Sequence, residues 1–315
     1  MSVYNFSCYH FTKWVQEGQI TQAEFIIVAV LNLITILPAF FLNALVLISI
    51  WRTSMLHTPA MVLLGNLALS DLAVGIIAQP AVLSWTALEL KAAECEKTYC
   101  IFATLFGILS SFFSVVSGLS ITTVAVDRFL ALYLHLKYKS LITMKMVTIV
   151  CIVVWFLAAI IGVSWILFGM ETYNVIICSV MVICVTIILV CYFKIYNVMR
   201  KHLNQIQVAP VNTPREDSTA FNVTSSLKYK KSVIFSLYIY FAFVLCYMPC
   251  FAAFAYHGIT GDNRFATFVK MSVTIVLMNS GMNPVIYCLK MRELRSAIRK
   301  TLTSLGCYST GSLSP

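Results

Sequence analysis

Residues 100–129, CIFATLFGILSSFFSVVSGLSITTVAVDRF, join a long apolar run to a charged pair. No residue from 100 to 126 carries a charge, and the run ends at Asp127 and Arg128. A helix of about 20 apolar residues crosses the roughly 30 Å hydrocarbon core of a bilayer. The stretch therefore predicts a membrane-spanning helix that reaches the aqueous boundary at this pair.

The composition of the whole 315-residue chain also indicates a membrane protein. Hydrophobic residues make up 60% and charged residues 11%, and the mean hydropathy is +0.88, whereas a soluble domain carries far more charge. We therefore predict an all-α membrane protein, folded as a seven-transmembrane helix bundle. The seven apolar stretches lie near 25–51, 60–85, 100–126, 147–169, 173–196, 232–257 and 266–289.

The positions of Lys and Arg predict the orientation, because these residues accumulate in short cytoplasmic loops. With the N-terminus outside, 17 of the 22 fall on the cytoplasmic side. We expect a multi-pass plasma-membrane protein with an extracellular N-terminus and a cytoplasmic C-terminus. The basic residues gather at helix ends, where membrane lipids and cytosolic partners meet them, so the net charge of +10 does not predict nucleic-acid binding. The five predicted extracellular residues are Lys13, Lys91, Lys97, Arg264 and Lys270.

Three segments follow from this topology: an extracellular tail over 1–24, the seven-span domain over 25–289, and a cytoplasmic helix and tail over 290–315. The tail shows no removable signal peptide. The loop over 201–228 has the composition of a solvated linker. Only a few residues around 171–174 join the fourth and fifth spans, so we expect no hairpin lid over the extracellular mouth.

A short amphipathic cytoplasmic helix is predicted over residues 289–302, lying on the inner leaflet. Leu294, Ile298 and Leu302 recur at helical spacing on one face. Cys307, just beyond this helix, is a candidate for palmitoylation, and an unmodified thiol fits the pattern equally well. The opposite, basic face consists of Arg292, Arg295, Arg299 and Lys300.

Two short motifs in the order of the chain carry a family resemblance. Asp127-Arg128-Phe129 ends the third span, and Asn283-Pro284-Val285-Ile286-Tyr287 lies near the end of the seventh. Together they resemble the corresponding helices of class A (rhodopsin-like) G-protein-coupled receptors, over about residues 26–302. The resemblance implies a receptor that binds an extracellular or membrane-derived ligand. It would activate heterotrimeric G proteins through opening of the cytoplasmic side of the bundle.

Within class A, the chain looks most similar to the melanocortin, lysophospholipid, cannabinoid and adenosine group. The segment Asp71–Gly75 and the short second extracellular loop carry this similarity, together with Cys184 where a kinking proline is usual. Leu277 stands where opsins carry the retinal-linking lysine, so a non-opsin receptor is expected.

The resemblance also assigns a switch. Asp127 is expected to restrain Arg128 in the resting state, and the released Arg128 to contact the G protein. A snorkelling anchor is the other interpretation of such an arginine. Pro249 removes a backbone donor and kinks the sixth span, with Tyr247 where a tryptophan is usual. The predicted switch residues are Asp127, Arg128, Tyr192, Tyr247, Pro249, Asn283, Pro284 and Tyr287.

Asp71 lies near the middle of the second span, where inserting an ionisable residue into the bilayer costs roughly 2.5–3.5 kcal/mol. Its presence at that depth therefore calls for an explanation. One interpretation is a neutral, hydrogen-bonded packing carboxyl. The resemblance instead implies a polar pocket that holds an allosteric sodium ion in the inactive state. No other cofactor is expected. The predicted sodium ligands are Asp71, Ser117, Asn279, Ser280 and Asn283.

A ligand pocket is predicted among the second, third, sixth and seventh spans. Its lining is aromatic and apolar with a few hydroxyls, which favours a lipid-like or small, weakly polar ligand. The candidate residues are Gln79, Phe106, Ser110, Ser111, Ser114, Tyr247, Phe251, Phe254 and Val273.

Three cysteines, Cys8, Cys95 and Cys100, fall in the predicted oxidising space and are disulfide candidates. The family usually ties the top of the third helix to the second extracellular loop, which has no cysteine here. Cys95, Cys8 and, through an unwound turn, Cys178 remain as partners for Cys100. Asn5, in the sequon Asn-Phe-Ser, is expected to be glycosylated.

Two other functional classes fit the residues less well. A seven-helix transporter or channel without G-protein coupling is the alternative. It would need several buried carboxylates or an inverted repeat, but Asp71 is the only carboxylate in the predicted spans apart from Asp127 at the boundary, and the spans show no internal repeat. An intramembrane hydrolase needs paired aspartates, a histidine metal site or a Ser-His arrangement. Because the histidines fall outside the membrane core, no enzyme is predicted. They are His10, His57, His135, His202 and His257.

Overall fold

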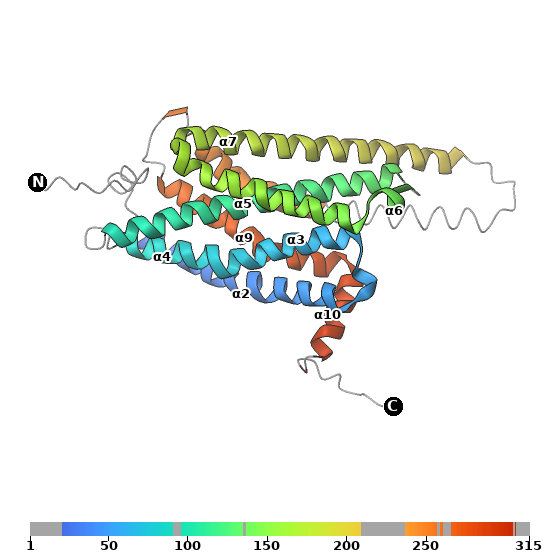
Figure 1. The fold of residues 1–315 in the computed structure, drawn as a ribbon, viewed down its shortest axis with the longest axis horizontal. Helices are drawn as coiled ribbons and strands as arrows, with labels where there is room; N and C mark the ends of the chain where they lie inside the picture. Colours follow the sequence, from blue (N-terminus) through green and yellow to red (C-terminus); the bar gives the residue numbers. More distant parts are fainter. Residues whose placement is uncertain are drawn as a thin grey trace, which may run out of the picture.

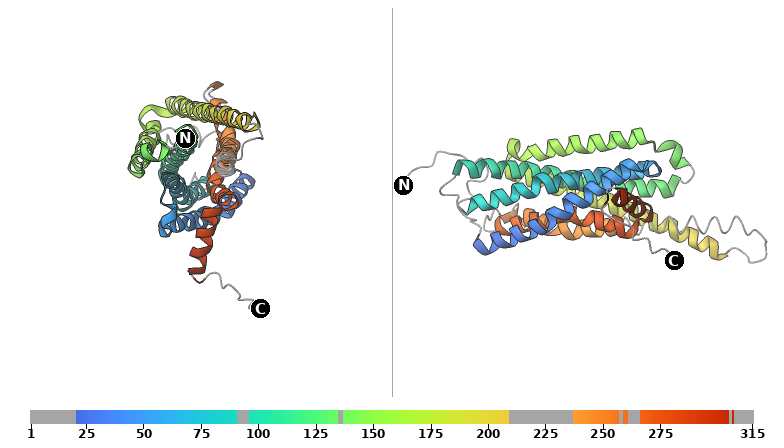
Figure 2. Two further views of the ribbon diagram at one scale, coloured as in Figure 1. Left: turned by 90° about the vertical axis from the view of Figure 1, so that its right-hand side faces the viewer. Right: turned by 90° about the horizontal axis from the view of Figure 1, so that it is seen from below.

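The computed structural model describes residues 21–90, 96–134, 137–208, 237–256, 259–260, 266–304 and 306. Seven helical segments in these ranges are long and apolar enough to cross a membrane, and no strand occurs among the described residues. The predicted seven-helix bundle is therefore confirmed. The segments lie alongside one another in Figures 1 and 2. They are Gln22–Arg52, Pro59–Glu89, Thr98–Leu134, Met144–Ser164, Thr172–Val198, Leu237–Tyr256 and Phe268–Leu289.

The first span begins at one end of the bundle, called here the Gln22 end. The third span finishes at the opposite end, called here the Arg128 end. The sixth span, Leu237–Tyr256, is named by its residues throughout. The labelled elements are α2 (Gln22–Arg52), η1 (Ser54–Leu56), α3 (Pro59–Ala73), η2 (Val74–Ala78), α4 (Gln79–Glu89), α5 (Glu96–Leu134), α6 (Tyr138–Leu141), α7 (Met144–Val208), α9 (Ala266–Lys290) and α10 (Arg292–Ser304).

Local sequence signals set the starts of the first two spans. At α2, the Thr21 hydroxyl accepts a hydrogen bond from the Glu24 backbone N–H at 3.3 Å. The Glu24 carboxylate accepts one from the Thr21 N–H at 2.8 Å, which completes a capping box. At α3, Thr58 caps the helix and Pro59 takes the first position, where no intrahelical donor is needed.

The second span is interrupted by a π-helical turn that the sequence did not predict. α3 passes through η2 into α4, so that the span contains one wide turn just after Asp71. Gly75 lies in this turn. A Cβ atom there would stand 3.1 Å from Ala39 Cβ and 3.2 Å from the Phe40 backbone nitrogen. The absence of a side chain at Gly75 therefore lets α2 approach the second span closely.

The fourth and fifth spans follow each other along α7 with a sharp kink between them. Gly169 has φ 84° and ψ 168°, a conformation that a side chain disfavours. The fourth span ends at Ser164 and the fifth begins at Thr172, so the connection is as short as the sequence indicated. It leaves no room for a hairpin.

Buried polar contacts tie three spans together. The Trp155 indole N–H donates to Asn66 Oδ1 at 2.7 Å, and Asn66 Nδ2 donates to Ser120 Oγ at 2.8 Å. Polar side chains inside a membrane find their partners across helices. Trp155 could be interpreted from sequence as a packing residue alone. Its hydrogen bond shows that it also links the second and fourth spans.

The helix after the seventh span, α10, forms as predicted, but its apolar face has a different partner. Leu294 and Ile298 are buried in a hydrophobic cluster of the bundle. Thr301 accepts a hydrogen bond from Ser49 at 3.1 Å, and Arg52 donates to Ser304 at 2.9 Å, so α10 packs against the end of α2. The expectation that this face lies on lipid is wrong for Leu294 and Ile298. α10 also turns away from α9 in Figure 1.

We expect Gly75→Ala to destabilise the fold. The added methyl group would press on backbone atoms of α2 that cannot rotate away, and overpacking of this kind typically costs about 1–3 kcal/mol. Gly65→Ala is the matched control, because its Cβ would meet only Ile50 Cδ1, at 3.8 Å. Thermal unfolding of the purified proteins in one detergent measures both. An equal melting temperature for the two variants would contradict the close approach at Gly75.

Candidate functional site

The Arg128 end of the bundle holds the predicted charged pair. Asp127 is buried, and Arg128 forms an ion pair with its carboxylate. The other oxygen of Asp127 accepts a hydrogen bond from the Tyr138 hydroxyl at 2.6 Å. Tyr138 lies in α6, a short helix between the third and fourth spans. This donor could not be predicted from the sequence, because a tyrosine in a loop gives no signal of its partner.

Aromatic contacts surround the pair on the side of the fifth span. Phe129 stacks on Tyr133 with ring centroids 5.5 Å apart. The ammonium of Lys194 lies 5.6 Å from the centroid of the Phe129 ring, which is within the range of a cation–π interaction. Phe129 therefore connects the third span to the fifth.

The centre of the bundle holds the predicted polar residues around Asp71. Asp71 is fully buried, and one carboxylate oxygen accepts a hydrogen bond from Asn283 Nδ2 at 2.8 Å. The Ser280 side chain lies beside the same carboxylate. Within the described part of the chain, the second Asp71 oxygen and both polar atoms of the Asn279 amide have no hydrogen-bond partner. Buried oxygens in this condition suit the coordination of a hard cation such as sodium.

Asn43 explains how the seventh span tolerates Pro284. A proline has no N–H, so Pro284 leaves the carbonyl of Ser280, four residues earlier, without its helical donor. Asn43 Nδ2 donates to this carbonyl at 3.0 Å and to the Ala39 carbonyl at 2.8 Å. The first span thus satisfies the backbone group that the proline exposes, next to the polar centre.

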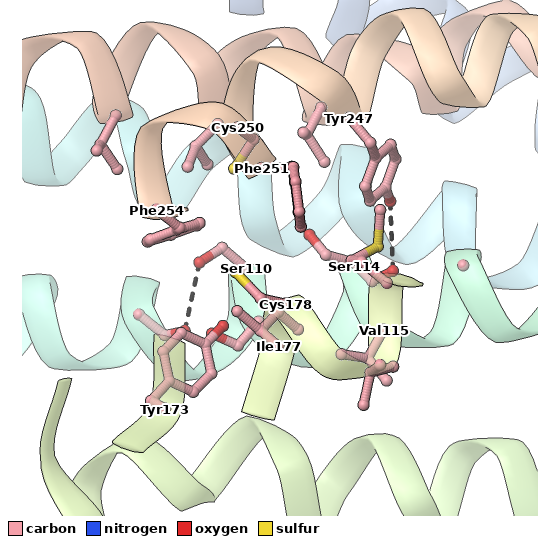
Figure 3. A pocket seen from close by; sticks show the side chains of 18 of the residues that line it. Ser110, Ser114, Val115, Tyr173, Ile177, Cys178, Tyr247, Cys250, Phe251 and Phe254 are labelled. Atoms are coloured by element: carbon pink, nitrogen blue, oxygen red, sulfur yellow. Dashed lines mark hydrogen bonds between the residues drawn. The ribbon is translucent and has the colours of Figure 1, made fainter. Parts of the chain in front are cut away.

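Tyr247 lies between the polar centre and the Gln22 end of the bundle. Its ring packs against Phe243, with centroids 4.2 Å apart. Its hydroxyl donates to the Ser114 carbonyl at 3.3 Å (Figure 3), and the Ser117 side chain lies beside it. Pro249 follows two residues later in the same helix. The part of the sixth span next to Pro249 is thereby attached to the third.

The two switch tyrosines have different surroundings. Tyr287 is fully buried in the hydrophobic cluster near the Arg128 end. Tyr192 is half-buried at the edge of the same cluster, and its ring lies 5.9 Å from that of Tyr240 on the sixth span. Tyr240 was not singled out from the sequence, because only the packing of the fifth span on the sixth reveals it.

A cavity of about 110 Å³ opens between the third, fifth, sixth and seventh spans (Figure 3). Apolar and aromatic side chains dominate its lining, with the hydroxyls of three serines. Of the nine residues predicted for the pocket, these eight line it: Phe106, Ser110, Ser111, Ser114, Tyr247, Phe251, Phe254 and Val273.

Gln79 was assigned to the pocket incorrectly. It is fully buried at the start of α4, where its Nε2 donates to Thr35 Oγ1 at 2.7 Å. The π-helical turn of η2 comes directly before Gln79. The wider turn rotates every later side chain about the helix axis. A prediction that assumes a regular α-helix therefore places Gln79 on the cavity side of the second span, whereas its side chain points toward α2.

Many lining residues were missed from the sequence, and three of them make specific contacts in or beside the cavity. Trp85 stacks on Phe106 with ring centroids 4.8 Å apart, and the Tyr173 hydroxyl lies 2.7 Å from Ser111 Oγ. Lys270 also lines the cavity. The prediction that Lys270 lies in an extracellular segment is wrong, because it is buried within α9 and forms an ion pair with Glu89. Asp71 and Asp127 are therefore not the only carboxylates within the spans, because Glu89 is the last residue of the second span.

Cys100 is disulfide-bonded at the Gln22 end. Cys178 is a free thiol, so the hypothesis that it pairs with Cys100 through an unwound turn is wrong. The other candidate partners, Cys8 and Cys95, lie outside the described residues, as do Asn5 and Cys307.

Seven spans with a charged pair at one end, a polar centre and an apolar cavity toward the other end define a membrane receptor. The chain matches the family model "7 transmembrane receptor (rhodopsin family)" over residues 42–181 and 169–287. It therefore belongs to the rhodopsin family of seven-transmembrane receptors. Members of this family are receptors, and this protein is not an enzyme.

Several curated proteins are similar along most of the chain. Sphingosine 1-phosphate receptor 1 of Danio rerio is 25% identical, covering 84% of this chain and 75% of the relative. Adenosine receptor A2a of Homo sapiens is also 25% identical, over 83% and 68%. Melanocortin receptor 3 of Mus musculus is 23% identical, over 85% and 82%. These relatives support the G-protein-coupled receptor class inferred from the motifs.

Thiol labelling tests whether the cavity is accessible. Cys250 and Cys246 stand one turn apart on the sixth span and are both free, but only Cys250 lines the cavity. We expect a small neutral maleimide to modify Cys250 at least several times faster than Cys246 in the folded protein. Mass spectrometry with Cys250→Ser and Cys246→Ser as matched variants assigns the label. Equal rates at the two thiols would show that the cavity is closed to small molecules.

Proposed function

We propose that this receptor activates heterotrimeric G proteins through its Arg128 end. The observation that carries the proposal is Arg128 held by the buried Asp127, whose carboxylate is also bound by Tyr138. A snorkelling anchor would need neither a buried acid nor a second donor to that acid. An arginine restrained in this way can be released when the helices around it move.

The sixth span is the element that we propose moves. Pro249 weakens its hydrogen-bond ladder, and Tyr247 attaches the kinked region to the third span through Ser114. A ligand in the cavity contacts Tyr247 directly, since Tyr247 is part of the lining. Binding that favours another position of this ring would shift the equilibrium of the sixth span and open the Arg128 end, where Tyr192 and Tyr287 lie.

For the orientation, we propose that the Gln22 end faces the extracellular space and the Arg128 end the cytosol, in the plasma membrane. The distribution of Lys and Arg along the sequence supports this assignment. Two N-glycosylation sequons test this orientation in cells. Asn5 should carry a glycan because the N-terminal tail would be extracellular, and Asn222, in the sequon Asn-Val-Thr, should carry none because its loop would be cytosolic.

The ligand that the cavity suits best is small and weakly polar, or lipid-like. Ser110, Ser111 and Ser114 supply hydroxyls in an otherwise apolar and aromatic lining. The names of the similar receptors refer to sphingosine 1-phosphate, adenosine and melanocortin. Since these are three different ligands, the relatives do not identify the ligand of this chain. The proposed ligand class therefore rests on the residues that line the cavity.

We also propose that sodium acts as an allosteric ligand at the polar centre. Asp71 would supply the negative charge, and the neighbouring hydroxyl and amide oxygens the remaining ligands. The buried, unpartnered oxygens of Asp71 and Asn279 in the described structure support this role. A cation bound to the resting arrangement alone would oppose activation. The proposed ligands are Asp71, Ser117, Asn279, Ser280 and Asn283.

Two substitutions at the Arg128 end should act in opposite directions. Arg128→Ala should reduce basal and ligand-driven nucleotide exchange to the background, because the group that contacts the G protein is lost. Tyr138→Phe should raise basal exchange about tenfold, because it removes a hydrogen bond to a charged group that restrains the pair. Exchange is measured with the purified receptor and a panel of purified G proteins.

Tyr196→Phe is the matched control, because this tyrosine is exposed on α7. It should leave exchange unchanged, and all variants are compared at equal concentrations of folded, purified receptor. Wild-type exchange in Arg128→Ala would remove the proposed coupling role. A transporter or channel would give no exchange in any variant.

Sodium should lower basal exchange in the wild-type receptor, and Asp71→Asn should abolish this dependence. The substitution removes the charge but keeps the shape of the side chain and the hydrogen bond to Asn283. Choline replaces sodium at constant ionic strength, so that general screening stays fixed. A wild-type receptor that does not respond to sodium would leave Asp71 as a neutral packing carboxyl.

A further inference from the structure

A buried ion pair stands beside the cavity at the Gln22 end. Lys270, in the first turns of α9, donates from Nζ to the carboxylate of Glu89, the last residue of α4. Both side chains are 1% exposed. The Lys270 ammonium also lies 5.5 Å from the centroid of the Trp85 ring, a cation–π contact. The lysine thus has two partners on the second span.

Burying such a pair costs desolvation free energy, which apolar residues at the same positions would not cost. Removing an ammonium and a carboxylate from water is expensive, and apolar residues of similar volume often stabilise a fold equally well. In a span, ionisable residues that face the interior mark functional sites more often than packing positions. The position of the charges relative to the cavity indicates which function applies.

Of the two charged residues, Lys270 is the one that lines the cavity. Among the described lining residues, it is the sole Lys, Arg, Asp or Glu, and Glu89 does not belong to the lining. Among the described residues, the carboxylates of Glu89 and of Glu24, in the first turn of α2, act on Lys270. A molecule in the cavity therefore reaches the positive charge of the pair first. The rest of its surface meets the rings of Trp85 and Phe106 and apolar side chains.

We propose that the cavity binds an acidic amphiphile, whose carboxylate or phosphate group pairs with Lys270 while its apolar body lies among the aromatic residues. This inference rests on the proposed function, since it names the chemical class of the ligand of that receptor. The anionic group exchanges with Glu89 for hydrogen bonds from the ammonium, which are strong when both partners are charged. Trp85 holds the lysine at the cavity wall during the exchange.

The size of the cavity selects the probes. A closed apolar cavity of about 150 Å³ accepts a benzene-sized molecule, and this cavity measures about 110 Å³. A medium-length chain that extends out of the cavity is therefore a better first probe than a long-chain lipid. Four ligands share one chain and differ in the head group: decanoate, decyl phosphate, decanol and decylamine.

Binding is measured by titration calorimetry on the full-length receptor in phosphatidylcholine nanodiscs, without G protein. We expect decanoate or decyl phosphate to bind about tenfold more tightly than decanol, and decylamine to bind more weakly than decanol. Whichever acid binds more tightly identifies the head group as carboxylate or phosphate. Equal affinities for the acids and decanol, or a preference for decylamine, would overturn the proposal.

Variants of the pair separate a ligand anchor from a structural brace. Lys270→Gln should abolish the preference for the acids, Lys270→Arg should retain it, and Glu89→Gln should increase it by removing the competing carboxylate. Decanol affinity should stay unchanged in all three, which reports that the cavity is intact. If Lys270→Gln and Glu89→Gln weaken acids and decanol alike, the pair is a brace between α4 and α9, and the proposal is wrong.

The outcome is independent of G-protein coupling. An acid preference that depends on Lys270, together with unaltered exchange in Arg128→Ala, would uphold the ligand class and reject the coupling proposal. Loss of exchange in Arg128→Ala without any acid preference would do the reverse.

Discussion

The constraint on which this structure depends is that polar groups inside a membrane must find their partners within the protein. Helical backbone bonds satisfy most of the described chain, and contacts from other helices satisfy several of the groups that remain. Asn43 on α2 binds the carbonyl that Pro284 leaves without a donor. Asn66 joins Ser120 to Trp155 across three spans. These contacts avoid the free-energy cost of an unsatisfied polar group in the bilayer core, and they also fix the relative positions of the spans.

The polar groups at the places where function is proposed are of two kinds, unpaired and paired. The polar centre at Asp71 retains unpaired oxygens within the described residues, which suits a cation. The charges at the two ends are paired instead: Arg128 with Asp127, and Lys270 with Glu89. Tyr247 lies between these sites, as part of the cavity wall and in contact with Phe243. Under the proposed function, an equilibrium of the sixth span would respond to a ligand, an ion and a G protein together.

The apolar runs gave the number of spans, because length and hydropathy determine which helices can cross a bilayer. The predicted direction of a side chain was wrong where the backbone departs from a regular α-helix. The π-helical turn before Gln79 directs its amide to Thr35 instead of the cavity. Leu294 and Ile298 were recognised as one face of a helix, but spacing cannot distinguish a lipid surface from the end of α2 as the partner of that face.

The sequence by itself determined the membrane class and the seven spans, since composition and hydropathy are local properties. It also singled out the residues proposed for the switch and the ion site, and eight of the residues that line the cavity. Only the tertiary structure decided which side chains meet. Tyr138 reaches Asp127 across a loop, and Lys270 reaches Glu89 across 181 positions of sequence. Such pairs depend on how helices rotate and pack against each other, and a single sequence contains no signal that joins two distant residues.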